Sequence, residues 1–242
     1  MTMNYRETGK PYSESEWTKG IQIMTATAEK LEKDGLLPKE FPSPEIKFRH
    51  AEVLRMNEIG AEVEKQVLRY KEFGFSKKLK MTNEKFKDQI MGLVTPQPEK
   101  YRGRFDIPII VLGSKIWARQ QYESIGFNYN VNIIAIESYD PRGYEDQRSP
   151  HLVWMQDGTG KSASGIKWNS FHNDERGANV FDGVGLMVAR PDLLEDHFVV
   201  LPGSSFGAYK RAVLWKGIDN GQHVNMFNAD VAEHYSYASC GR

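Results

Sequence analysis

The chain has 242 residues, of which 40% are apolar and 26% are charged, and its 32 basic side chains balance 32 acidic ones. This composition is typical of a globular protein with a full hydrophobic core and excludes a largely disordered chain. Zero net charge argues against a general nucleic-acid binder, which normally carries an excess of positive charge, so no nucleic-acid partner is expected.

The first residues are polar and charged, without the apolar core of a signal peptide. The longest apolar run, from Ile107 to Leu112, is far shorter than the about 20 residues that a membrane-spanning helix needs. We therefore expect a soluble, cytoplasmic protein without a membrane partner. Cys240 is the single cysteine, which excludes an internal disulfide. We expect it as a small apolar residue in a C-terminal strand, with a reactive thiol as the alternative.

Helical periodicity dominates the first hundred residues. A helix is expected from Ser15 to near Gly35, followed by a proline-rich connector. The clearest pattern covers residues 51–73, where apolar side chains recur three and four positions apart until Gly74 ends the helix. The residues expected to be buried there are Val53, Met56, Val63, Val67 and Tyr70. Packing on the chain's own domain is the main interpretation, and a coiled-coil contact in a homo-oligomer is the alternative.

A third helix is expected from Asn83 to Leu93, with Thr82 or Asn83 as its N-cap. After Pro98 the pattern changes to short strands interleaved with two helices, at 114–126 and 179–189. The expected strands are 107–112, 131–136, 151–155, 197–201, 212–216 and 223–228. This order predicts an α+β fold in which a helical N-terminal layer packs on a mostly antiparallel sheet. Residues 1–50 are expected to form a helical arm, and residues 51–242 the α+β domain.

Familiar catalytic and metal-binding patterns do not occur. Gly160-Lys161-Ser162 is similar to the end of a phosphate-binding loop, but Met155 stands where the loop needs its first glycine. No helix is expected after this segment to place amide groups on phosphates, so nucleotide hydrolysis is not expected. The six histidines lack the spacing of metal ligands, and we expect no bound metal and no cofactor.

Two polar segments are the candidate site. One surrounds His172, and the other is an expected loop from Pro202 to Arg211, whose glycines allow backbone amides to converge on an anion. Hydroxyl and basic side chains in or near this loop would complete such a site, and the helix that ends near Arg190 would reach it. The candidate ligand-binding residues are His172, Arg190, Ser204, Ser205, Lys210 and Arg211. A plain hairpin connection is the alternative.

The C-terminal part of the chain, from Asp182 onward, resembles the signature of an uncharacterised bacterial family, a domain of unknown function. The matching residues are Asp182–Leu194, Leu201–Ser204, Gly207, Lys210–Arg211, Val213–Trp215 and Ala238–Arg242. The family's hairpin is richer in arginine at the positions where this chain has Phe206 and Tyr209. The resemblance implies a shared fold and a bacterial origin, and it carries over no activity.

Two classes of function follow from these observations. A non-enzymatic binding or interaction protein, with a small anionic ligand or a protein as its partner, is the main prediction. A hydrolase or transferase of unrecognised type is the alternative. It would act on a small anionic substrate through the loops near His172 and Ser204.

Overall fold

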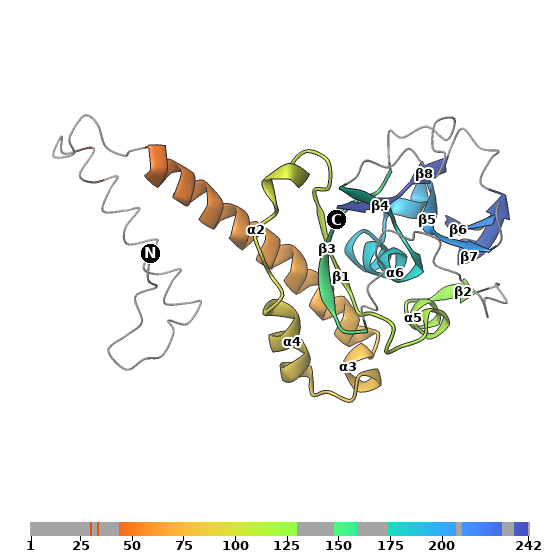
Figure 1. Cartoon of the computed structure of the whole chain (residues 1–242). Coiled ribbons are helices and arrows are strands. Elements are labelled where there is room, and N and C mark those ends of the chain that lie inside the picture. Colours follow the sequence, from red (N-terminus) through yellow and green to blue (C-terminus); the bar gives the residue numbers. More distant parts are fainter. Residues whose placement is uncertain are drawn as a thin grey trace. The chain divides into compact units, whose positions relative to one another are not determined.

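The computed structural model of the chain is shown in Figure 1. It describes Lys30, Lys33 and residues 44–129, 148–158, 174–206, 210–228 and 235–241. The chain divides into two compact units, Met1–Glu52 and Val53–Arg242. The second unit has the predicted α+β fold, with helices packed against strands of two sheets. Apart from Lys30 and Lys33, which are helical, the helix expected from Ser15 to Gly35 lies outside the described residues, as does the strand expected at 131–136.

Helix α2 (Pro44–Glu72) contains the periodic segment that the sequence singled out. It begins earlier than expected, because proline is well tolerated in the first turn of a helix. Gly74, with a left-handed φ of 76°, follows its end as predicted. Of the expected stripe, Val63, Val67 and Tyr70 are fully buried, whereas Val53 and Met56 are only half-buried. This face of α2 therefore belongs to the core of the chain itself.

Two short helices follow α2. They are α3 (Phe75–Lys78) and α4 (Asn83–Met91). Thr82 caps α4 as predicted, and its hydroxyl accepts a hydrogen bond from the Lys85 amide. Helix α5 (Ala118–Ser124) is shorter than the 114–126 expected from sequence.

The first sheet is antiparallel and has the order β1-β3-β9-β4. Its strands are β1 (Ile107–Val111), β3 (His151–Gln156), β9 (Ser239–Gly241) and β4 (Glu175–Gly177). Strands β1 and β3 lie where the sequence predicted them. The short strand β9, near the C-terminus, is inserted between β3 and β4 (Figure 1).

The second sheet is mixed and has the order β2-β7-β6-β5-β8. Its strands are β2 (Phe127–Tyr129), β7 (Gln222–Asn228), β6 (Lys210–Lys216), β5 (Phe198–Phe206) and β8 (Tyr235–Tyr237). The outer strands β2 and β8 pair in parallel with their neighbours, and the central pairs are antiparallel. The expected loop from Pro202 to Arg211 is thus largely strand, since β5 continues past an irregularity between Leu201 and Ser205.

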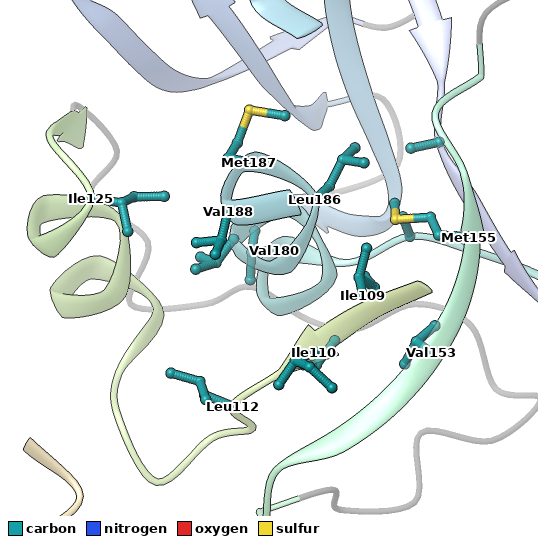
Figure 2. Close-up of a cluster of buried hydrophobic side chains, with 14 of the residues drawn as sticks. Ile109, Ile110, Leu112, Ile125, Val153, Met155, Val180, Leu186, Met187 and Val188 are labelled. Atoms are coloured by element: carbon teal, nitrogen blue, oxygen red, sulfur yellow. The ribbon is translucent and has the colours of Figure 1, made fainter. Parts of the chain in front are cut away.

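Helix α6 (Val180–Ala189) packs against a strand of each sheet, β1 and β5. It is apolar on nearly all sides, as a helix surrounded by other elements must be. Two glycines permit the close approach: a Cβ atom at Gly183 would lie 2.6 Å from Leu201 Cδ1, and one at Gly185 would lie 2.8 Å from the Ile110 carbonyl oxygen. Figure 2 shows side chains of α6 between Ile125 and the side chains of β1 and β3.

Candidate functional site

Ser204, a candidate ligand residue, lies at the start of α6. Its hydroxyl accepts a hydrogen bond of 3.0 Å from the Val180 amide, and the serine is fully buried. Asn179 caps the same helix end by accepting hydrogen bonds from the Phe181 and Asp182 amides. The first amides of α6 are therefore hydrogen-bonded within the fold.

A buried ion pair lies beside this helix start. Arg176 on β4 donates to both carboxylate oxygens of Asp182, at 2.5 and 3.0 Å. Asp182 also accepts a hydrogen bond from the Asn179 amide, which completes a capping box. Cys240 on β9 is close to this pair and is fully buried, as its predicted place in a C-terminal strand requires. Burial raises the pKa of its thiol well above the usual value, which disfavours a reactive thiolate.

A second polar network joins the ends of β3, β4 and β9. The Glu175 carboxylate is buried and accepts hydrogen bonds from the Ser239 hydroxyl at 2.5 Å and the Gln156 amide at 3.1 Å. Nearer the surface, Arg104 donates to Asp174 at 2.9 Å, and this contact lowers the pKa of the Asp174 carboxyl. These groups hold the three strand ends together.

The two basic candidates on β6 do not lie on the same face of the sheet. Lys210 and Arg211 are neighbours on β6, and neighbouring residues of a strand point to opposite faces of the sheet. Accordingly, Lys210 is exposed and Arg211 is buried. Arg190, after α6, lies 3.6 Å from Asp192. Ser205 pairs with Arg211 across the hairpin, but its side chain and all of His172 lie outside the described residues.

An aromatic row that the sequence pattern did not predict crosses β5, β6 and β7. Phe198 stacks on Trp215 with centroids 6.3 Å apart, and Trp215 stacks on His223 with centroids 4.7 Å apart. Asp219 Oδ1, in the β6–β7 turn, lies 3.3 Å from His223 Nε2. The pKa of the Asp219 carboxyl is lowered, mainly because the carboxylate accepts a hydrogen bond from the Gly221 backbone amide. The stacked rings lie on neighbouring strands, so they add cross-strand contacts to the sheet.

Exposed apolar side chains gather on the outward face of α2. Leu54 and Leu68 have exposed fractions of 49% and 54%, and Ala61, midway between them, is also exposed. At 3.6 residues per turn, positions seven apart lie on one side of a helix. Glu58 and Lys65 are exposed on the same side. We call these five residues the outer stripe. Their seven-residue spacing is visible in the sequence, beside the buried stripe that the periodicity predicts.

Side chains beside and opposite the outer stripe fix α2 to the core by polar contacts as well as apolar ones. The Gln66 amide group donates to the Pro108 carbonyl at 2.7 Å and accepts from the Ile110 amide at 2.9 Å. The Tyr70 hydroxyl donates to the Ile110 carbonyl at 2.6 Å. Arg69 donates to the last carbonyls of α6, where a positive charge is favourable. These contacts cover the outer edge of β1 and hold the outer stripe outward.

No family model, curated protein or solved structure matches this chain. The resemblance of the C-terminal part to an uncharacterised bacterial family therefore stays a prediction. Within the described ranges, no helix combines the length and the apolar character that crossing a membrane requires.

Proposed function

We propose that this chain is a non-enzymatic interaction protein and that the outer stripe of α2 is its contact surface. The observation that carries the proposal is the pair of half-exposed leucines, Leu54 and Leu68, on one face of a helix whose other face is in the core. A single exposed leucine needs no explanation. Two leucines and an alanine recurring every seven residues form one apolar row along the helix, and the charged Glu58 and Lys65 lie between them on the same side.

The anchoring of α2 supports this role. Gln66, Arg69 and Tyr70 hold the helix against β1 and α6 through hydrogen bonds. The outer stripe is thus presented on a helix that is stabilised without a partner. Pre-organisation of this kind improves affinity, because little conformational entropy remains to be lost on binding.

The positions of the polar candidates are also consistent with an interaction protein. Ser204 caps α6, Asp182 pairs with Arg176, and Cys240 is buried with a raised pKa. Each of these groups performs a structural task in the fold. One of the arguments for anion binding is weakened, because the two basic side chains of β6 point to opposite faces of the sheet. The anion site itself stays a prediction.

Site-specific photo-crosslinking in cells tests the proposal. A photoreactive phenylalanine analogue is placed at Leu54 or Leu68, and Glu84, exposed on α4, is the matched control position. Discrete adducts of higher mass are expected from both leucine positions and none from the control. If neither leucine position gives an adduct while the variants remain folded, the outer stripe is not a contact surface and the proposal fails.

A further inference from the structure

We infer that the outer stripe binds the outer stripe of a second copy of this chain, with the two helices antiparallel. This inference rests on the proposed function and specifies its partner. It follows from the order of charges between the leucines: Glu58 precedes Lys65 by seven residues, and both are exposed on the same face as Leu54 and Leu68.

An antiparallel arrangement pairs unlike charges twice. When a two-fold axis passes between residues 61 and 62, position 58 lies opposite position 65 of the other copy. Glu58 then faces Lys65 of the partner subunit, and the symmetry repeats the pair. A parallel arrangement in register would place Glu58 beside the partner subunit's Glu58, which costs free energy. The charge order therefore selects the antiparallel direction.

The apolar residues fit the same arrangement. Leu54 and Leu68 are separated by about 21 Å along the helix, at 1.5 Å per residue, and Ala61 lies midway. With the same axis, Leu54 lies opposite position 69 of the partner subunit, one residue from the partner subunit's Leu68, and the symmetry repeats this at the other end. The small Ala61 side chain at the centre lets the two helices approach closely. Apolar contacts at both ends and charge pairs between them make the stripe complementary to itself.

The size of the stripe sets the expected strength. One helix face of this length is smaller than the roughly 1,200 Å² of total buried surface at the lower end of stable interfaces. We therefore expect a reversible dimer that forms and dissociates with concentration. The Lys65–Glu62 ion pair within α2 is exposed on both sides, so it competes only weakly with a contact between copies.

Charge reversal tests the pairing directly. Glu58→Lys and Lys65→Glu are made separately in the full chain, and dissociation constants are measured by sedimentation equilibrium. Each variant alone places like charges together twice and should dimerise about tenfold more weakly or worse. An equal mixture of the two variants restores both unlike pairs and should form heterodimers as tightly as the parent forms homodimers. Lys77→Glu, at an exposed site on α3, is the control and should leave dimerisation unchanged.

Three outcomes would overturn the inference: a parent chain that stays monomeric up to millimolar concentration, single variants that dimerise like the parent, or a mixture that fails to form heterodimers. Circular dichroism of each variant shows whether it is folded. The crosslinking experiment separates this inference from the proposed function. Adducts that contain a different protein would preserve the interaction role and reject a second copy as the partner, whereas absent adducts would reject both.

Discussion

Replacing Gln66 with leucine should destabilise the fold strongly, although the two side chains are similar in size. The Gln66 side chain acts like one residue of an additional strand at the edge of β1: it donates to the Pro108 carbonyl and accepts from the Ile110 amide. Gln66 is 2% exposed, so water does not take over these contacts in the variant. A leucine side chain can neither donate to the Pro108 carbonyl nor accept from the Ile110 amide.

The magnitude follows from the two backbone groups that would lose their partner. Each buried donor or acceptor left without a hydrogen bond costs about 1–3 kcal/mol. The Pro108 carbonyl and the Ile110 amide together give about 2–6 kcal/mol, against a total free energy of unfolding of about 5–15 kcal/mol for a typical domain. The variant should therefore lose a large part of its stability.

Urea denaturation followed by circular dichroism measures this loss as a shift of the midpoint at constant m-value. The matched control is Gln120→Leu, because Gln120 is exposed on α5, and it should change stability by less than about 0.5 kcal/mol. Hydrogen exchange adds a local readout, since the Ile110 amide should exchange faster in the Gln66 variant. A destabilisation no larger than that of the control would refute the idea that Gln66 completes the edge of β1.

Three further predictions concern the buried polar groups and the histidine of β3. Asp182→Asn should lower the melting temperature strongly, because breaking a buried ion pair costs about 3–5 kcal/mol; a melting curve like that of the parent would contradict the role of the pair with Arg176. Cys240 should react with a thiol reagent only at the rate of unfolding, and rapid labelling of the folded chain would contradict its burial. Burial lowers the pKa of His151 below its ordinary 6.5. The unfolded chain therefore binds this proton more readily, and the stability of the parent relative to His151→Gln should fall as pH drops below about 6.5. A stability difference that is independent of pH in urea titrations would exclude this linkage.

Local patterns in the sequence predicted the regular elements well. The buried stripe of α2 and the apolar helix α6 follow from periodicity, and Asn179 is the kind of residue that caps a helix. Strands β1 and β3 were recognisable as apolar runs before the fold was known. The fold class followed from the order of these elements, and the structure confirms it.

The short strands and the role of Ser204 depend on distant partners. Strand β4 has only three residues, too few to show a periodicity, and it forms because it pairs with β9. Ser204 lies near glycines and therefore has the sequence context of a loop. Its hydroxyl is instead used by Val180, 24 residues earlier in the chain. Strand pairing and the hydrogen bond of Ser204 join residues far apart in the chain, so no local sequence pattern predicts them.

The proposed function predicts that the two faces of α2 act separately, one in stability and one in association, and this can be measured. Gln66, Arg69 and Tyr70 contact the core, whereas Leu54, Leu68 and the two charges between them contact solvent in the single chain. Gln66→Leu should therefore reduce the free energy of unfolding while leaving the dissociation constant of the folded chain near that of the parent. Glu58→Lys should raise the dissociation constant of the dimer while leaving the free energy of unfolding near that of the parent. A helix whose contact face and core face respond independently is a scaffold for association, because partner binding is then not required for folding.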